Sequence, residues 1–282
     1  MNRARSLGSS SLLALALVVT AASVGSGCDD DDKKKQLLTK TASSSSASPA
    51  STASAIAAAV SAAAAEDAAP PKKAIVCQPG EPKITDPDLE ADIRKKLGKS
   101  PDKGAITNAD LANVKSLNLT TKKSLDELDP CVMPKMKGLK HLYLGPGKLT
   151  DLRPIESLTL LETLRASINE VEDLKPLEKL VMLDALDLGR THVRNIEALS
   201  NLVNLTDLQL DNTQVTDLAP LAKCKKLEKL SVKHTNVIDV SPLKELTKLK
   251  WLYVEGCAIS NLDSLAPLVT RGLKIVTRPE GK

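Results

Sequence analysis

Phenylalanine is absent from this chain of 282 residues, and aromatic residues of all kinds make up 1% of it. A core without large rings must be filled by Leu, Val, Ile and Ala, since protein interiors are closely packed. That requirement favours a fold that stacks small, similar layers over one that fills irregular space with rings. The hydrophobic share of 42% is still enough for one ordinary core at this length.

A strong excess of one charge is also lacking, because 39 Lys and Arg residues stand against 35 Asp and Glu, a net charge of +4. Such a balance gives no reason to expect a nucleic-acid partner. The chain has no Gly-rich phosphate loop, no Cys and His spacing suited to zinc and no nucleophile motif, and its three histidines are scattered. We therefore predict no enzyme activity, no cofactor, no metal site and no small-molecule substrate.

The N-terminus has the features of an export signal. The basic segment MNRARS is followed by an apolar run over residues 12–22, which is too short to cross a bilayer comfortably as a helix. Small residues then lead to Cys28, and the segment resembles a bacterial lipoprotein signal, in which the cysteine is lipidated and becomes the mature N-terminus. Ser26 and Gly27 fit that pattern, whereas Gly25 stands where a large aliphatic residue is usual, so an ordinary secretory signal is the alternative. Residues 1–27 are thus predicted to be a signal peptide, and the protein a membrane-anchored lipoprotein of the bacterial cell envelope, on its periplasmic or surface side.

Residues 28–73 do not have the composition of a folded segment. DDDDKKK is followed by runs such as TASSSSASPASTASA, which bury too little apolar surface to offset the entropy of the chain. We predict a flexible Ser/Ala-rich tether between the lipid and a folded head.

A 22-residue unit occurs six times in succession without insertion, starting at Met136, Leu158, Leu180, Leu202, Cys224 and Leu246. Counted from the start of each copy, positions 4 and 7 are always Leu, positions 17 and 20 are always aliphatic, and position 16 is always Asp or Asn. Positions 7 and 9 alternate as a strand requires. The Asx residue, followed in four copies by Pro at position 19, predicts a short capped helical turn. Each copy is thus predicted to form one coil of a solenoid.

This pattern resembles the leucine-rich repeat family, specifically its 22-residue, internalin-like class, over about residues 84–276. The resemblance implies an α/β solenoid with a parallel, concave β-sheet, short helical turns on the convex side and protein binding by the concave sheet. The family usually has Asn at position 12, whose buried side chain bonds neighbouring backbones. We expect this ladder to be looser at both ends, because the position holds Gly147, Asn169, Thr191, Thr213, Thr235 and Cys257.

An N-terminal helical cap is predicted over residues 74–113, since the end coil of a solenoid otherwise exposes its core. DPDLEADIRKKLG is typical of a helix with Pro87 in its first turn and Gly98 at its end, and Thr107 with Asp110 starts a shorter one. This arrangement resembles the cap of internalin-like proteins. Repeats are predicted over residues 114–282, from a first strand in VKSLNL to a last one in LKIV.

The cysteines fall into two groups. Cys77 precedes the cap and Cys131 lies in a loop after the first strand, so in an exported protein these two are predicted to form a disulfide, with two free thiols as the alternative. Cys224 and Cys257 take core positions on different sides of a coil. We predict that they are core thiols and form neither a disulfide nor a metal site.

The only Trp and both Tyr residues lie at positions 6 and 8, which must point outward if positions 7 and 9 point into the core. Rings on a rigid open surface are typical of binding hot spots. Because they occur in the first and last copies, about 24 Å apart at ~4.8 Å per strand, shielding of the sheet ends is the competing interpretation. The predicted protein-binding face comprises His141, Tyr143, Arg165, Asp187, Asp207, Gln209, Lys229, Trp251 and Tyr253.

Charges of both signs stand side by side on this face, where neighbouring opposite charges partly neutralise each other. A nucleic-acid face would be basic throughout, so the mixture favours an unidentified protein partner. Glycan or peptidoglycan binding is an alternative that the wide separation of the rings disfavours. A purely structural role in the envelope is the other alternative.

Overall fold

The structure is a computed structural model, and it describes residues 77, 80–100 and 104–278. All of these residues belong to one compact unit, Pro71–Lys282. The predicted signal peptide over 1–27, the predicted tether over 28–73 and Cys28 lie outside the described residues. Within the part of the chain that is described, no helix is both long and apolar enough to cross a membrane.

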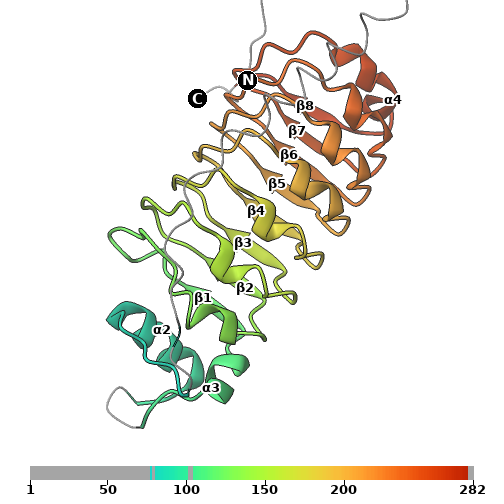
Figure 1. Cartoon of the computed structure of the whole chain (residues 1–282). Helices are drawn as coiled ribbons and strands as arrows, with labels where there is room; N and C mark the ends of the chain where they lie inside the picture. The colour runs from blue at the N-terminus through green and yellow to red at the C-terminus, as the bar shows by residue number, and fades with distance from the viewer. Residues whose placement is uncertain (1–76, 78–79, 101–103, 279–282) are drawn as a thin grey trace, which may run out of the picture. The chain divides into compact units, whose positions relative to one another are not determined.

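Eight short parallel strands form one sheet in chain order, as Figure 1 shows. In each of the six copies the strand covers positions 6–8, because the Leu at position 7 is its buried middle residue. The register places equivalent residues opposite each other, as in Leu142 and Leu164, so the prediction of one coil per copy is confirmed. The strands are β1 (Ser116–Asn118), β2 (His141–Tyr143), β3 (Thr163–Arg165), β4 (Ala185–Asp187), β5 (Asp207–Gln209), β6 (Lys229–Ser231), β7 (Trp251–Tyr253) and β8 (Lys274–Val276).

Short 3-10 turns follow the strands, and Figure 1 shows them along one side of the sheet. In five copies the Asx oxygen at position 16 accepts a hydrogen bond from the backbone N–H two residues later, as Asp151 does from Arg153 at 2.9 Å. The sixth copy differs, because Asn261 accepts from Val240 of the preceding coil at 3.0 Å. The turns are η1 (Met133–Lys135), η2 (Arg153–Ile155), η3 (Lys175–Leu177), η4 (Glu197–Asn201), η5 (Ala219–Lys223), η6 (Ser241–Glu245) and η7 (Leu262–Leu265), and helix α4 (Ala266–Val269) continues the last one.

The core is a stack of aliphatic layers without a ring. In the fourth copy, for example, Leu202, Leu205, Leu208 and Leu210 are all fully buried. Equivalent side chains of successive coils pack on one another, so truncating one of these Leu residues to Ala should cost about 2–5 kcal/mol.

The position 12 ladder is looser than the sequence predicted. Thr191, Thr213 and Thr235 do bond the backbone, but each donates at 2.7 Å to the position 9 carbonyl of its own coil. Only Asn169, among the residues at this position, bonds the backbone of a neighbouring coil through its side chain. Cys257 is half-buried rather than buried, because the last coils cover it less completely.

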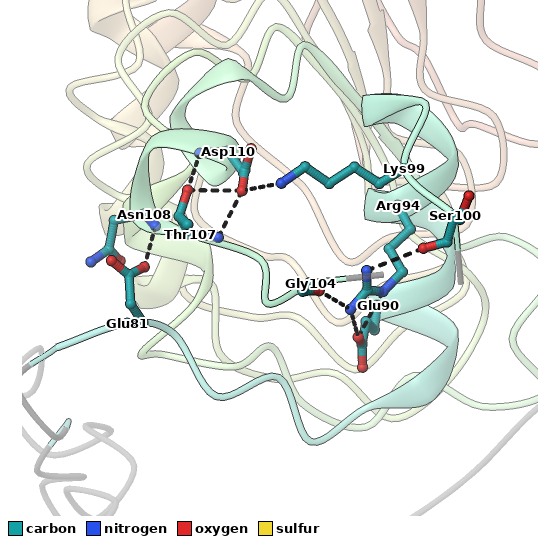
Figure 2. Close-up of polar contacts among 9 residues, drawn as sticks. All are labelled: Glu81, Glu90, Arg94, Lys99, Ser100, Gly104, Thr107, Asn108 and Asp110. Carbon is teal, nitrogen blue, oxygen red and sulfur yellow. Dashed lines mark hydrogen bonds and ion pairs between the residues drawn. The ribbon is translucent and has the colours of Figure 1, made fainter. Parts of the chain in front are cut away.

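The two predicted helices of the cap are confirmed as α2 (Pro87–Leu97) and α3 (Asn108–Asn113). Gly98 ends α2 in the left-handed conformation, at φ 64°, where a glycine has no steric penalty. Thr107 and Asp110 form the capping box of α3, and Lys99 reaches Asp110 at 2.6 Å, as Figure 2 shows. These contacts tie α3 to the segment that follows α2.

The cap covers the first strand. Asp92 of α2 accepts a hydrogen bond from the backbone N–H of Asn118 in β1 at 2.9 Å, which occupies part of the sheet edge. In the structure Cys77 and Cys131 are joined by a disulfide, with Cα atoms 5.3 Å apart. The bond links the segment before α2 to the loop between β1 and η1.

Position 11 adopts the left-handed conformation in five copies, although it holds a glycine in only one, Gly256. The others hold Ile168, Arg190, Asn212 and His234, with φ between 53° and 60°. In each of these four, the backbone N–H donates to the position 10 carbonyl of the next coil at 2.7–2.8 Å. The bond between coils therefore holds a conformation that the side chains alone disfavour, most of all the β-branched Ile168.

Candidate functional site

The nine residues predicted to bind a partner all lie on the open face of β2 to β7, flanking the buried Leu of each strand. We call the side chains at positions 6 and 8 of these strands the concave face. Arg165 is exposed and the other eight are half-buried, so they contact one another as well as solvent. The regular spacing of the strands makes this face a fixed array rather than a mobile loop surface.

The rings at the C-terminal end of the face form one cluster. Trp251 and Tyr253 stack with ring centroids 6.1 Å apart and planes inclined by 10°. The ammonium of Lys274, on β8, lies 4.5 Å from the centre of the Trp251 ring, and that of Lys233 lies 5.0 Å from the centre of the Tyr253 ring. Each cation–π contact is worth about 0.5–1 kcal/mol at an exposed site, so the lysines help to fix the ring orientations.

The remaining ring, Tyr143 on β2, is separate from this cluster, since four strands lie between β2 and β7. Its strand also carries His141, whose Nδ1 lies 3.2 Å from the hydroxyl oxygen of Thr163. The concave face therefore has an aromatic group near each end and none between them.

Charged side chains in the middle of the face are paired, as the sequence indicated. Arg165 Nε lies 3.2 Å from Asp187 Oδ2, and the hydroxyl of Ser167 donates to the same oxygen at 3.0 Å. Lys229 Nζ lies 3.1 Å from Asp207 Oδ2. Such partly exposed pairs contribute little to stability, about 0–1 kcal/mol each. Their consequence is an organised pattern of donors and acceptors.

Two shallow, open hollows lie side by side over these pairs. One has a volume of about 290 Å³ and is floored by Ala185, whose small side chain leaves a gap between Thr163 and Asp207. The other, of about 320 Å³, extends towards the position 11 residues Ile168 and Arg190. Arg165, Asp187 and Gln209 line both hollows.

One acceptor in this region has no partner within the described structure. The Oδ1 atom of Asp207 is buried and accepts no hydrogen bond there, whereas its Oδ2 atom pairs with Lys229. An unsatisfied buried acceptor costs about 1–3 kcal/mol. A donor group brought by a ligand would remove that cost.

Sequence reasoning missed two parts of this site. Lys274 belongs to the last strand, and only the register of β7 with β8 places it opposite Trp251. The hollow near Ile168 and Arg190 depends on the left-handed backbone at position 11, which no glycine at those positions announces. The small Ala185 in the position 6 column was a usable signal for the other hollow.

Among the described residues, no group of three or more His, Cys, Asp or Glu side chains is arranged to hold a metal ion. The concave face instead offers rings, paired charges and open hollows. Together with the eight-stranded parallel sheet and its short connecting turns, it defines the class of protein: the chain is a leucine-rich repeat solenoid.

Comparison with solved structures gives the particular relatives. An internalin (inlF) of Listeria monocytogenes is 28% identical at a TM-score of 0.60, covering 65% of this chain and 53% of that one. Internalin C2 of the same species is 28% identical at a TM-score of 0.57, covering 68% and 93%. A leucine-rich repeat protein of Leptospira interrogans is 25% identical at a TM-score of 0.56, covering 62% and 45%. These likenesses support the predicted resemblance to bacterial internalin-like proteins.

The chain spans about half the length of the first of these internalins. No protein-family model matches it, and no curated protein sequence does. The comparisons therefore establish the architecture, while the role of the concave face rests on its own residues.

Proposed function

We propose that this protein is an exported recognition module that binds another protein through its concave face, and that a lipid on Cys28 anchors it in the bacterial cell envelope. One observation carries the proposal. All three Trp and Tyr side chains of the chain stand on the one open face of the sheet, although its core, which holds no Phe, is built without rings.

Trp and Tyr dominate the energetics of protein interfaces because they bury a large area at a low cost in conformational entropy. Here Trp251 and Tyr253 are stacked and flanked by lysines before any partner arrives. Such preorganisation lowers the entropic cost of binding. The rings also lie one strand inside each end of the sheet, since β1 and β8 are outermost. That placement supports binding more than shielding of the sheet ends.

The centre of the face supports the same role. The hollow over Ala185 has a small apolar floor and polar walls, and it borders the Asp207 oxygen that lacks a donor. A partner side chain carrying an N–H or O–H group fits this chemistry. Paired charges around the hollow would provide specificity rather than strong attraction.

Glycan binding is less well supported. A sugar that stacks on an aromatic platform needs an open ring face, whereas Lys274 and Lys233 each lie over one face of the two stacked rings. Tyr143 is too far away to extend the platform, at about 24 Å for strands spaced ~4.8 Å apart.

The proposal is tested by affinity capture from the cell envelope, with the chain carrying Cys28→Ala as bait so that no lipid contributes. Three baits are compared: the parent, the Trp251→Ala/Tyr253→Ala variant, and a control in which Ile238 and Val269, exposed hydrophobic residues outside strands β1 to β8, become Ala. A protein retained by the parent and control baits but lost from the ring variant is then purified. Direct titration of that protein should give at least about ten-fold weaker binding to the ring variant.

Circular dichroism and thermal unfolding must show that the three baits fold alike. Equal retention by all three baits would refute the role of the rings. Retention of soluble glycan fragments in place of a protein would favour the alternative function.

The anchor is tested separately in the bacterium that makes the protein. Wild-type chain should incorporate labelled fatty acid and remain with the membrane fraction, whereas Cys28→Ala should do neither. Membrane retention of the Cys28→Ala chain without label would point to another mode of attachment.

A further inference from the structure

A second surface lies along the edge of the sheet, where each coil turns from its 3-10 turn into the next strand. Positions 21 and 22 of one copy and positions 2 and 3 of the next meet at this turn. We call each such turn a junction, number it by the copy that it enters, and call junctions 2 to 6 together the edge strip. None of its residues belongs to the concave face.

Contacts between junctions show that the strip is continuous. Asn204 of junction 4 donates to the Val181 carbonyl of junction 3 at 2.8 Å, and Lys226 of junction 5 donates to Asn204 Oδ1 at 2.7 Å. Lys225 reaches the Glu245 carbonyl of junction 6 at 3.4 Å. Side chains along the strip are therefore neighbours in space.

The first half of the strip is apolar. Four of the seven large hydrophobic side chains that are exposed in the described structure lie in junctions 2 to 4, and each is 43–47% exposed: Leu160, Val181, Met182 and Val203. Scattered exposed hydrophobic residues need no explanation, but a contiguous row of them marks an interaction surface.

Charge reverses along the same strip. Junctions 2 and 3, with the adjoining position 5 residues, carry four acidic side chains and one basic one: Glu156, Glu162, Glu178, Asp184 and Lys179. Junctions 5 and 6, counted in the same way, carry six basic side chains and two acidic ones: Lys223, Lys225, Lys226, Lys244, Lys248, Lys250, Glu228 and Glu245. Junction 4, between them, has no charged residue and contains Ser200, Asn201, Val203, Asn204 and Thr206.

Two of these charges are already neutralised within the chain by partners on neighbouring coils. Glu162 pairs with Lys140 at 2.6 Å, and Lys250 pairs with Glu228 at 2.7 Å. The unpaired charges keep the same order, negative in junctions 2 and 3 and positive in junctions 5 and 6. The strip is thus oppositely charged on the two sides of an uncharged centre.

We propose that the edge strip binds a second copy of this chain, in an antiparallel pair related by a two-fold axis at junction 4. In that arrangement junction 3 of each copy faces junction 5 of the other, and junction 2 faces junction 6. Every acidic group then faces a basic one, and Val203 faces its own counterpart on the axis. A two-fold interface requires such self-complementarity, because the same patch serves both subunits.

A lipid surface or an unrelated acidic protein fits the strip less well. An anionic bilayer would attract the lysines of junctions 5 and 6 but repel the carboxylates beside the apolar row. A uniformly acidic partner would meet the same repulsion. Only a partner with the reversed charge order satisfies both halves, and a second copy turned end for end has that order.

The experiment measures the molar mass of the Cys28→Ala chain by sedimentation velocity, at roughly 50 µM protein and about 50 mM salt, where surface charges are weakly screened. The expected result is a mass near twice the 30.0 kDa of one chain. Two charge-reversed variants follow: Lys225→Glu/Lys226→Glu, and Glu178→Lys/Asp184→Lys. Each places like charges opposite one another in its own pair, so each alone should weaken dimerisation at least about ten-fold.

Mixing the two variants provides the decisive observation. In the mixed pair both contacts between junctions 3 and 5 are again between opposite charges, so the mixture should form a heterodimer of wild-type strength. A role in folding alone cannot produce such recovery in trans. Lys95→Glu/Lys96→Glu, on the exposed face of α2, makes the same change in net charge away from the strip and should dimerise like the parent.

A parent chain that stays monomeric under these conditions would overturn the proposal, as would charge-reversed variants that dimerise undiminished or fail to recover when mixed. Val203→Asp gives an independent check, because it places two carboxylates on the axis and should abolish the dimer. Binding of the monomer to phosphatidylglycerol vesicles, lost in Lys225→Glu/Lys226→Glu, would assign the strip to a lipid surface instead.

Discussion

Asn169 offers the sharpest test of how adjacent coils are held together. Its side chain is 4% exposed and makes four hydrogen bonds. Two of them cross to the neighbouring coil: the amide oxygen accepts from the Leu149 N–H at 3.2 Å, and the amide nitrogen donates to the Gly145 carbonyl at 3.0 Å. The other two stay in its own coil, to the carbonyls of Ala166 at 3.3 Å and Ser167 at 3.1 Å.

Three substitutions separate these contributions. Asn169→Ala leaves the Leu149 N–H and the Gly145 carbonyl buried without a partner, at about 1–3 kcal/mol each, so the free energy of unfolding should fall by about 3 kcal/mol or more. Asn169→Thr should keep one bond in its own coil, as Thr213 does to the Leu210 carbonyl at 2.7 Å, and should lose about 2 kcal/mol. Thr213→Ala removes a single bond and should cost about 1 kcal/mol.

Urea unfolding followed by circular dichroism measures these differences, and thermal unfolding checks them, at roughly 6–12 °C for the largest. The order of loss should be Asn169→Ala, then Asn169→Thr, then Thr213→Ala. If Asn169→Ala cost no more than Thr213→Ala, the bonds between coils would contribute nothing beyond the bonds within them, and the reasoning would fail.

Other predictions follow from the cap and the core. Cys77 and Cys131 close a chain separation of 54 residues, so replacing both by Ser should lower the free energy of unfolding by about 2–4 kcal/mol. Reduction of the parent should cost a similar amount, and an unchanged thermal midpoint in dithiothreitol would contradict this. The pKa of Asp110 is lowered to about 2, mainly by the hydrogen bond from Lys99. Because this pKa lies below that of the unfolded chain, the stabilisation is complete above about pH 4 and is lost as the pH falls through 2. Asp110→Asn should flatten the dependence of the thermal midpoint on pH between 2 and 4, and an identical slope would exclude the effect. Burial raises the pKa of Cys224 to about 11, so at pH 8 its thiol should react with a disulfide reagent at least about ten-fold faster after unfolding than before; equal rates would show that the site is open.

Much of the solenoid could be predicted because its signals are local and repeated. The Leu at position 7 marks the middle of each strand in all six copies, as Leu208 does in β5. Pro87, Gly98 and Thr107 mark helix ends through backbone chemistry that acts within a few residues. Alternation along a strand was enough to place Trp251 and Tyr253 on the open face.

Contacts between coils could not be read in this way. Thr213 has the chemistry to bond either its own coil or the next, and only the packed geometry directs it to its own. Ile168 is a poor residue for a left-handed backbone, yet the bond from its N–H to the Gly189 carbonyl at 2.8 Å holds it there. Local preference is worth about 1–2 kcal/mol, which bonds between neighbouring coils can outweigh.

The sequence by itself determined that this protein is a stack of similar coils, which side chains fill the core and which face outward, because a period of 22 residues fixes the phase of every copy. Only the tertiary structure decided which outward side chains meet. It brings Lys274 to Trp251, opens a hollow over Ala185 and aligns the edge strip from Glu156 to Lys248. The physical reason is that neighbours across coils lie about 22 residues apart in the chain, so their distances depend on how the coils stack rather than on any local preference.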